Sequence, residues 1–235
     1  SEELKTALLA SLGHDLRTPL TAIRIAASNI KASWMTDAAR AEQTDLILSE
    51  VERLTRLFQN ILDMARIDAG AIAAETRWTH PSEIIAAARG QVEQTLQRHT
   101  LDVHVDPDVP VRLDPRLTAT ALAHLLENAA QYSPAGSTIS VSARVTDEGL
   151  AVQVADRGPG IAPADLPYLF DRFYRGAAAT THLSGTGMGL AIARGLLAVE
   201  RGRIWAENGP DGGAQFTILV PAATKGSEPP LSTIP

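Results

Sequence analysis

The sequence predicts an α-helical hairpin that forms a dimeric four-helix bundle, followed by an α+β domain. Two observations carry this prediction. Apolar residues recur every three or four positions over the first 70 residues, which is the spacing of one helix face. From about residue 75 the pattern changes, and short segments of alternating apolar and polar residues are interspersed with helical segments.

Residues 1–70 are predicted to form two long helices joined by a short break. The break falls at Trp34–Asp37, where Thr36 or Asp37 can cap the second helix, and Gly70 is a suitable stop. Two helices cannot bury their apolar faces well alone, so we expect pairing with a second copy. The apolar positions are Leu4, Leu8, Leu12, Leu16, Leu20, Ile23, Ala27 and Ile30, then Ile47, Val51, Leu54, Phe58, Ile61 and Ala65.

Residues 71–80 are expected to form a linker or hinge, residues 81–221 the second domain, and residues 222–235 a disordered tail. Asp114 and Pro115 mark the start of a helix, and Asp147-Glu148-Gly149 marks a hairpin turn. The expected helices cover 81–98, 115–129 and 188–199, and the expected strands cover 101–105, 138–145, 150–155, 203–206 and 214–220.

The composition narrows the classes of function. A net charge of −6 argues against nucleic acid as a main partner, because domains that neutralise phosphates are usually basic. The absence of cysteine excludes disulfides, thiol catalysis and cysteine-ligated zinc, and fits a cytoplasmic address. No apolar run is long enough to span a membrane, and no signal peptide is recognisable. The abrupt start inside a helical pattern suggests a fragment of a longer protein.

The stretch SLGHDLRTPL places a histidine, an acid and a proline inside the first predicted helix. His14 lies about 200° around the helix from the apolar positions two residues away, so it points to solvent. A lone exposed histidine usually belongs to a solvated polar face. Pro19, however, frees the carbonyl of Asp15 and should bend the helix beside His14. This combination favours a reactive site, because a neutral imidazole is nucleophilic near pH 7.

Two downstream clusters have the residue types of a ligand site. Leu125–Tyr132 lies on a predicted helix and presents Asn128 and Gln131 at positions i and i+3, with Tyr132 beside them. A carboxamide oxygen suits Mg²⁺, and Tyr132 could stack on a base, although an ordinary half-buried helix has the same residues. Asp156–Ile161 follows a strand and is either a turn where backbone approaches a ligand or a simple Asp-Gly turn.

Two more clusters follow. Residues 169–175 hold three aromatic side chains in a chain with 4% aromatic residues, and they serve either core packing or the anchoring of a lid. Gly185–Leu190 has glycine at every second position before a helix, and N–H groups at a helix N-terminus bind phosphate. Its spacing matches neither the dinucleotide motif nor the P-loop. Residues 176–184 are predicted to form a mobile lid.

In this order the five motifs resemble the H, N, G1, F and G2 boxes of bacterial sensor histidine kinases. The segment from His14 to Leu20 fits the H-box pattern H-[ED]-x-[RN]-[TN]-P-[LM] at every position. The resemblance covers about residues 1–221 and implies a phosphotransfer domain followed by a Bergerat-fold ATP-binding sandwich. It implies that His14 accepts the phosphoryl group and that Asp15 is its general base. Thr18 would position the water that hydrolyses the aspartyl phosphate of a response regulator.

The resemblance also implies ATP and Mg²⁺ as ligands. Asn128 would bind Mg²⁺, Asp156 would read the adenine amino group, and Tyr132 would line the adenine pocket. The two glycines of 158–160 would shape that pocket, and the three of 185–189 would form the triphosphate loop. The full set of implied nucleotide-binding residues is Asn128, Gln131, Tyr132, Asp156, Gly158, Gly160, Ile161, Phe173, Gly185, Thr186, Gly187, Met188, Gly189 and Leu190.

Two positions depart from the family pattern. Gln131 stands where the family often has Lys, Arg or His, so Arg172, Arg175 or His182 would have to supply a cation. His124 stands where Asn is frequent, and it is either a phosphate or metal contact or an ordinary satisfied histidine. Hydrolysing ATPases of the same superfamily have a glutamate at this position, so the sequence favours phosphoryl transfer over hydrolysis.

We therefore expect the cytoplasmic catalytic core of a sensor histidine kinase, with autophosphorylation on His14, transfer to an aspartate of a response regulator receiver domain, and phosphatase activity on that regulator. One alternative is a degenerate kinase that acts as a dimeric scaffold or binding module, and Gln131 is its only support. A second alternative is a protein in which phosphatase activity dominates. We expect a homodimer, no nucleic acid, and a membrane-bound parent protein. Residues 61–70 and 206–214 look similar to the potassium-sensing Kdp-type kinases.

Overall fold

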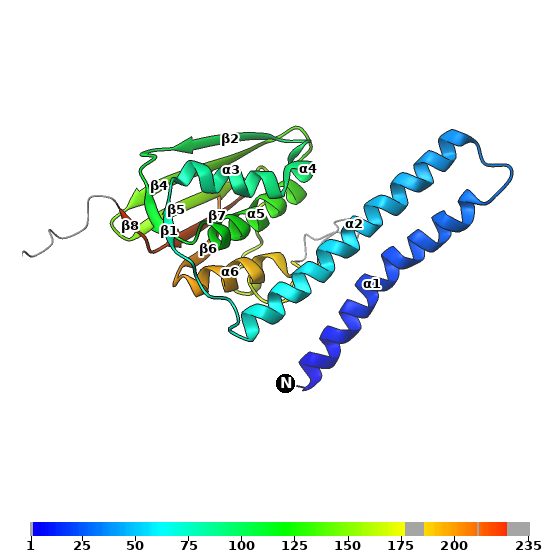
Figure 1. Cartoon of the computed structure of the whole chain (residues 1–235), viewed down its shortest axis with the longest axis horizontal. Helices are drawn as coiled ribbons and strands as arrows, with labels where there is room; N and C mark the ends of the chain where they lie inside the picture. The colour runs from blue at the N-terminus through cyan, green and yellow to red at the C-terminus, as the bar shows by residue number, and fades with distance from the viewer. Residues whose placement is uncertain (1, 177–185, 211, 225–235) are drawn as a thin grey trace, which may run out of the picture. The chain divides into compact units, whose positions relative to one another are not determined.

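The computed structural model describes residues 2–176, 186–210 and 212–224, without the side chains of residues 2–12, 14 and 15. The chain divides into two compact units, Ser1–Ala65 and Arg66–Pro235 (Figure 1). The division falls inside the second long helix, a few residues before the expected domain boundary at residue 70. Each unit has its own architecture.

The first unit is a helical hairpin of α1 (Glu2–Ile30) and α2 (Asp37–Asp68), as the sequence predicts. Thr36 caps α2, because its Oγ1 accepts a hydrogen bond of 3.2 Å from the N–H of Ala39. Beyond the end of α2, the N–H of Ala71 donates to the carbonyl of Arg66 over 3.0 Å, and Gly70 has a φ of +60°. This is the helix stop expected at Gly70.

The apolar faces of the hairpin are only partly covered within one chain. Ala26, Leu57 and Met64 are buried. Val51 and Phe58, which belong to the predicted apolar seam, are 45% and 55% exposed. Among the described side chains of the hairpin, the other exposed large apolar ones are Leu20, Ile25, Trp34, Leu46, Leu48 and Leu62. A single hairpin therefore leaves much of its apolar surface in water.

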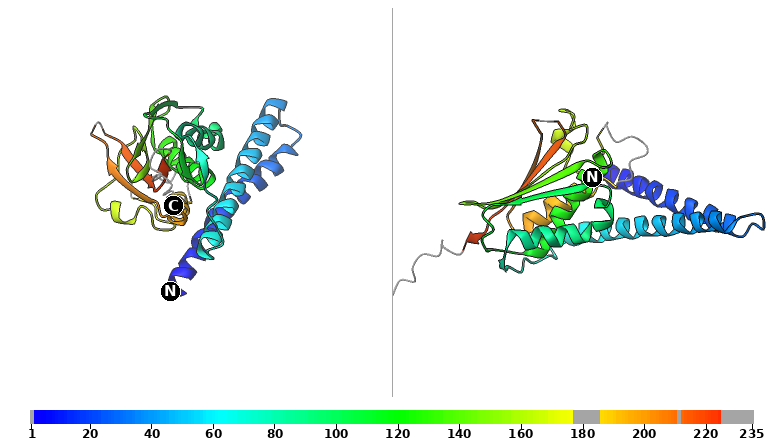
Figure 2. Two further views of the ribbon diagram at one scale, coloured as in Figure 1. Left: turned by 60° about the vertical axis from the view of Figure 1, so that its left-hand side comes forward. Right: turned by 90° about the horizontal axis from the view of Figure 1, so that it is seen from above.

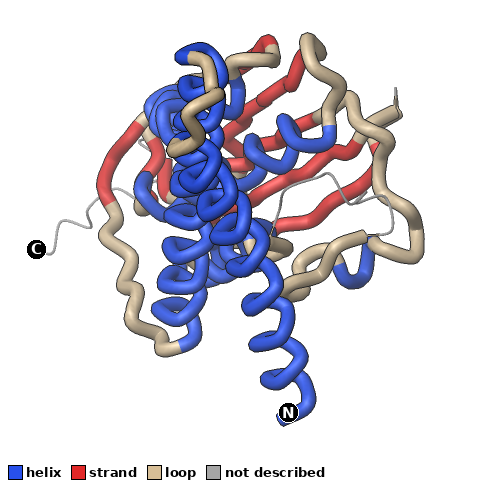
Figure 3. The backbone as a smooth tube through the Cα atoms, turned by 90° about the vertical axis from the view of Figure 1, so that its right-hand side faces the viewer, coloured by secondary structure: helices blue, strands red, loops and turns tan. Residues whose placement is uncertain are grey.

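The second unit is built on a five-stranded sheet with helices on one face (Figure 2, right; Figure 3). Neighbouring strands are antiparallel except β2 and β4, which are parallel. The strand order is β2 (Thr100–Val105), β4 (Thr138–Thr146), β5 (Gly149–Ala155), β7 (Ala214–Val220) and β6 (Arg203–Asn208). The helices are α3 (Pro81–Gln91), α4 (Glu93–Leu96), α5 (Pro115–Tyr132) and α6 (Gly189–Val199), with a 3₁₀ turn at Leu166–Tyr168.

Four features of this unit differ from the expectations. A three-stranded sheet of β1 (Arg77–Thr79), β3 (Val111–Leu113) and β8 (Ala223–Thr224) was not foreseen. Its strand β1 lies in the expected linker, and β8 lies in the stretch assigned to a disordered tail, which is a correction for those two residues. Strands of two or three residues are too short to show alternation. The helix expected over 81–98 is interrupted at Val92, where φ is −124°.

The core lies between the sheet and α5. On β5 the inward side chains alternate along the strand, and Val152 and Val154 pair across to Ile218 and Phe216 of β7. On α5 the side chains that face the sheet are completely or almost completely buried. Burial of each larger apolar side chain among them contributes about 1.5–3 kcal/mol to the free energy of folding. This packing sets the orientation of α5, and therefore the direction of its other face.

Asp114 caps α5 and connects three segments of the second unit. Its buried carboxylate accepts hydrogen bonds from the N–H groups of Arg116 (2.9 Å), Leu117 (3.3 Å) and Glu75 (2.8 Å), and its own N–H donates to Glu200 (2.6 Å). Burial raises the pKa of Asp114, but the hydrogen bonds outweigh it and hold the pKa below the usual value. The network joins the start of α5, the linker and the end of α6.

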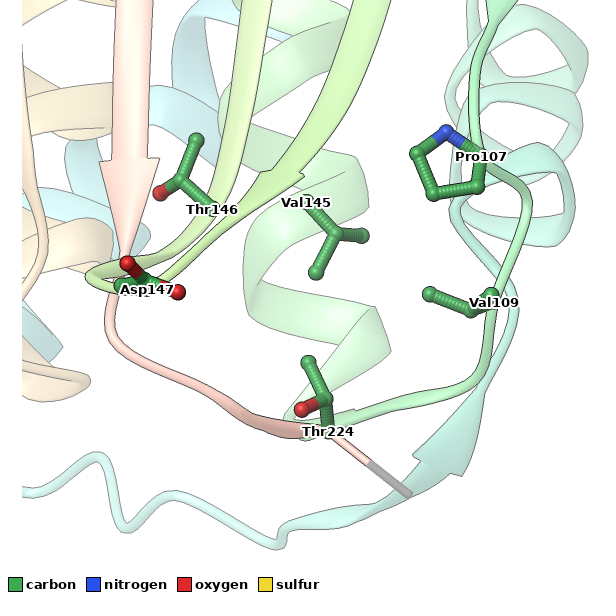
Figure 4. Close-up of a pocket in the computed structure, with 6 residues that line it drawn as sticks. All are labelled: Pro107, Val109, Val145, Thr146, Asp147 and Thr224. Atoms are coloured by element: carbon green, nitrogen blue, oxygen red, sulfur yellow. The ribbon is translucent and has the colours of Figure 1, made fainter. Parts of the chain in front are cut away.

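A pocket opens at one end of the large sheet (Figure 4). It lies where β4 and β5 meet at their turn, whereas Asp156 follows the opposite end of β5. None of the residues implied in nucleotide binding lines it. The lining residues are Pro107, Val109, Val145, Thr146, Asp147 and Thr224.

We expect Asp114→Asn to lower the free energy of unfolding by about 2–4 kcal/mol at neutral pH, because a charged, buried helix cap is lost. Urea denaturation measures this. The folded pKa of Asp114 lies below the unfolded one, so its stabilisation is present above about pH 4 and is lost as the pH falls through the folded pKa. The gap between wild type and variant should shrink in that range. Asp147→Asn, in the exposed β4–β5 turn, is the control, and equal losses for both variants would contradict the assignment.

Candidate functional site

The segment that carries His14 lies in α1, which continues through Pro19. Pro19 is buried, whereas Thr18 is exposed. The side chains of His14 and Asp15 lie outside the described part of the structure, so the roles expected for them stay predictions.

Helix α5 places Asn128 and Gln131 on its partly exposed side. Leu125, Leu126 and Ala129 are completely buried and hold the opposite side against the core. Asn128, Gln131 and Tyr132 are half-buried, so each combines a fixed backbone with an accessible polar group. His124 precedes Asn128 by one turn, and its Nδ1 lies 3.5 Å from a carboxylate oxygen of Glu127.

Asp156 is a nearly buried carboxylate at the end of β5, with 5% of its surface exposed. Its Oδ1 accepts hydrogen bonds from the N–H groups of Gly158 (2.8 Å) and Ala214 (3.0 Å). No hydrogen bond from the described residues reaches Oδ2. Burial raises the pKa of Asp156 above the usual value for aspartate, although both backbone hydrogen bonds oppose the rise. Such a carboxylate can accept one more donor from a ligand.

The turn after Asp156 packs directly against the end of α5. A Cβ added at Gly158 would lie 2.7 Å from the carbonyl oxygen of Tyr132, so only glycine fits there. The next contact is a hydrogen bond of 3.2 Å from the N–H of Arg157 to the hydroxyl of Ser133. Burial raises the pKa of Tyr132, and the positive charge of Arg175 opposes this rise. The structure thus brings together the turn at residues 156–161, the end of α5 and the aromatic segment at residues 169–175.

The aromatic segment at residues 169–175 and the glycine-rich segment before α6 meet through the backbone. The N–H of Phe173 donates to the carbonyl of Gly187 over 2.8 Å, and a Cβ at Gly187 would lie 2.7 Å from the carbonyl carbon of Phe173. Phe173 itself has a φ of +63°, which is strained for a non-glycine residue. The hydroxyl of Tyr174 donates to Asp165 over 2.8 Å. Most of the predicted lid, residues 177–184, lies outside the described residues.

The start of α6 faces the middle of α5. A Cβ at Gly189 would lie 3.4 Å from Nδ1 of His124, so the two helices are in close contact here. Met188, which precedes α6, is 1% exposed, and Thr186 and Leu190 beside it are half-buried. The N–H of the N-cap residue Met188 donates to Oγ1 of Thr186 over 3.4 Å, whereas the side chain of Met188 accepts no hydrogen bond from the first turn of α6, so the N–H groups of that turn can bind an anion. Gly185, the first glycine of this cluster, is outside the described residues.

The candidate cations have different surroundings. The guanidinium of Arg172 forms an ion pair with Asp68, and one of its hydrogen bonds measures 2.6 Å. Arg175 acts electrostatically on Tyr132, so its charge lies near the cluster on α5. His182 is outside the described residues. Arg175 is therefore the described cation that the structure associates with the site.

Sequence reasoning missed Asn208, Gly213 and Ala214, which lie at the β6–β7 turn. The sequence predicts only that Ala214 starts a strand and that Asn208 and Gly213 belong to the turn before it. In the structure, Ala214 donates to Asp156, and Asn208 forms two hydrogen bonds with Ile161. The run Asn208-Gly209-Pro210 signals a turn, but a turn signal does not say which other segment the turn contacts.

The sequence matches two protein families. Residues 4–70 match the His Kinase A (phospho-acceptor) domain, and residues 113–224 match the histidine kinase-, DNA gyrase B- and HSP90-like ATPases. Sensor protein KdpD of Escherichia coli is 36% identical over 224 residues, which is 95% of this chain and 25% of that protein. The histidine-protein kinase AfsQ2 of Streptomyces coelicolor is 32% identical over 94% of this chain and 42% of its own length. The chain thus spans less than half of these relatives.

Solved structures show the same fold. Histidine kinase AdeS of Acinetobacter baumannii matches with a TM-score of 0.70 over 88% of this chain and 97% of that one, at 24% identity. Full-length ShkA, solved in complex with AMPPNP, matches with a TM-score of 0.67 over 92% of this chain and 46% of that one, at 26% identity.

We expect Gly213→Ala and Gly212→Ala to differ strongly, although they are neighbours. Both glycines have positive φ, at +79° and +85°, so each alanine costs about 1–2 kcal/mol of stability. A Cβ at Gly213 would also lie 2.1 Å from the carbonyl oxygen of Asp156, whereas one at Gly212 meets nothing within 4 Å. Gly213→Ala should therefore lose about 1–3 kcal/mol more in urea denaturation. Equal losses would show that Gly213 does not press on the Asp156 turn.

Proposed function

This chain belongs to the sensor histidine kinases, and from that premise we propose that it phosphorylates its own His14 with ATP and passes the phosphoryl group to an aspartate of a response regulator. The observation that carries the proposal is the carboxylate of Asp156. It is buried, it is held by two backbone N–H groups, and it keeps one oxygen for a ligand donor. Such an oxygen can accept a hydrogen bond from an adenine amino group.

The adenine would lie in a site beside Asp156, formed by the end of α5 and the turn after Asp156. Tyr132 and Ile161 would line it, and Gly158 and Gly160 would allow the backbone to come close. The contact of Gly158 with the carbonyl of Tyr132 supports this placement, because it fixes the turn against the helix. Adenine selectivity would then follow from one charged acceptor on a rigid turn.

The triphosphate would lie at the start of α6, along residues 185–190. The uncapped N–H groups of the first turn and the close approach of Gly189 to His124 support this placement. Phe173 would brace this loop through its hydrogen bond to Gly187. Gln131, on the adjoining face of α5, would contact phosphate as a neutral donor.

Mg²⁺ would be held by the carboxamide oxygen of Asn128 together with phosphate oxygens. Among the described residues, no three His, Asp or Glu side chains gather into a metal site. Mg²⁺ commonly takes one or two protein ligands and completes its shell with substrate phosphates and water. When bound, the ion neutralises charge on the transferring group.

The transfer would be an in-line displacement. Nε2 of His14 attacks the γ-phosphorus, the bond to the β–γ bridging oxygen breaks, and ADP leaves with the electron pair of that bond. Asp15 would accept a hydrogen bond from the other ring nitrogen and so favour the nucleophilic tautomer. A flexible linker near residues 68–76 would let the ATP-binding domain reach His14. Thr18 would position water for dephosphorylation of the regulator.

A second copy of the chain is the partner that the hairpin requires. In one chain, Phe58 and Leu62 of the hairpin are 55% and 52% exposed. A dimeric four-helix bundle would cover these and the other exposed apolar side chains. Similarity to KdpD of two organisms, at 36% and 33% identity, supports a Kdp-type subfamily.

Of the helices described, none has the length and apolar character needed to cross a bilayer. We propose that this portion lies in the cytoplasm and that its parent is a membrane-bound sensor.

Incubation with γ-labelled ATP and Mg²⁺ tests the kinase activity. We expect an acid-labile, base-stable label on the wild type, because phosphohistidine has that stability, and no label on His14→Gln. His99→Gln, in the other unit, is the control and should retain the label. An unlabelled wild type that still binds ATP would favour the alternative of a degenerate, scaffold-like kinase.

We expect Asp156→Asn to weaken ATP binding by about tenfold or more at pH 8, because a charged acceptor is lost. Isothermal titration calorimetry measures this. The raised pKa of Asp156 means that the carboxyl protonates at a higher pH than an ordinary aspartate. The gap between wild type and variant should therefore narrow as the pH falls toward that pKa. Protonation of ATP itself affects the wild type and the variant equally, so it does not change the ratio of their dissociation constants. Equal affinities at pH 8 would contradict the assignment.

A further inference from the structure

The side chain of Asn208 holds the backbone of one distant residue from two sides. Its Oδ1 accepts a hydrogen bond of 2.7 Å from the N–H of Ile161, and its Nδ2 donates one of 2.9 Å to the carbonyl of Ile161. The two residues are 47 positions apart in the chain. Asn208 ends β6 and is itself exposed, so this pair of hydrogen bonds contributes little to the core.

Gly160 is fitted to this contact. Its φ is +78°, and a Cβ there would lie 2.8 Å from Oδ1 of Asn208. The side chain of Asn208 therefore occupies the space that any other residue at position 160 would need. The turn and the asparagine are complementary in shape as well as in hydrogen bonding.

The same β6–β7 hairpin holds the other end of the turn. Asn208 pairs with Ala214 in the register of β6 and β7, and Ala214 exchanges hydrogen bonds with Asp156, one through its N–H (3.0 Å) and one through its carbonyl (2.9 Å). Hydrogen bonds from Gly209 to Gly213 and from Gly212 to Gly209 close the hairpin end itself. The turn from Asp156 to Ile161 is thus clamped at its first and last residues.

We propose that Asn208 is a positioning residue of the adenine-binding turn. This inference rests on the proposed function, since it assigns the turn to ATP. Asn208 touches no ligand in this scheme. It acts by holding Gly160 and Ile161 in the conformation that the turn has in this structure, so that ATP does not have to order the turn when it binds.

Loss of the clamp leaves a turn with two glycines and one proline free to sample other conformations. We expect Asn208→Ala to raise the dissociation constant of ATP about tenfold, the effect of two hydrogen bonds that order the binding-competent state. The Michaelis constant for ATP should rise by a similar factor, while kcat at saturating ATP changes less than about threefold, because bound ATP restores the turn.

Calorimetry with ATP and Mg²⁺, and steady-state autophosphorylation of the full chain, measure these values. Glu207→Ala is the matched control, because Glu207 is the neighbouring exposed residue of β6 and its side chain bonds to Gln215 across the hairpin instead of to the turn. Its dissociation constant should stay within about twofold of the wild type. Thermal unfolding of each variant shows whether the domain stays folded.

A double-mutant cycle with Gly160→Ala adds a readout that a purely structural role would not change. Gly160→Ala should weaken ATP binding in the wild-type background, because its Cβ meets Oδ1 of Asn208. In the Asn208→Ala background that collision is absent, so the further loss should be at least about threefold smaller.

The outcomes separate the inference from the proposed function. A wild type that binds no ATP overturns both. A wild type that binds ATP, with an Asn208→Ala variant of equal affinity, overturns the inference alone, even if the variant melts at a lower temperature. Additive losses in the cycle also overturn it. Weaker binding for Asn208→Ala, unchanged binding for Glu207→Ala and a non-additive cycle together support it.

Discussion

The hydrogen bonds that end on the carboxylate of Asp156 are the interaction on which the nucleotide-binding unit depends. Burial disfavours a charged carboxylate, and the two backbone N–H groups that offset this come from segments far apart in the chain, at Gly158 and at Ala214. They can reach Oδ1 only if β7 begins beside the end of β5. A shift of β7 would take the Ala214 N–H away from a buried carboxylate, and this is more costly than the loss of an ordinary hydrogen bond. The sheet and the carboxylate that we propose to read adenine therefore form together.

Helix α5 is the second constraint, because one face of it serves the core and the other the site. Its buried face packs on the sheet, so the rotation of the helix about its own axis is settled by burial and not by the ligand. Asn128 and Tyr132 take their directions from that rotation. Asp114 fixes where α5 starts. The start of the helix sets the position of Asn128 and Tyr132 along the helix axis relative to the turn after Asp156. Stability and ligand geometry are thus properties of the same few contacts.

The sequence predicted the elements whose periodicity is long enough to read, namely the two long helices, α5 and the central strands. It also pointed to Asn128 and Asp156, because each stands in a short local motif. It did not point to Asn208, whose partner Ile161 lies 47 positions away. An asparagine before a Gly- and Pro-rich turn has the same local pattern whether its side chain meets water or another turn. Strands such as β1, with three residues, are too short for any periodicity, and only tertiary pairing defines them.

The proposed triphosphate site has to bind an anion in a chain whose net charge is −6. Gln131 adds no charge, and the guanidinium of Arg172 is already paired with Asp68. Much of the attraction would then come from the N–H groups at the start of α6 and from the metal ion that accompanies the nucleotide. Backbone donors have no rotamers to lose, so their value depends on where the fold holds α6. At the end of α6, Glu200 accepts hydrogen bonds from the N–H of Asp114 and the hydroxyl of Thr118, both at the start of α5. These two bonds fix the alignment in which the start of α6 faces the middle of α5, so the proposed phosphate site depends on contacts at the far ends of both helices.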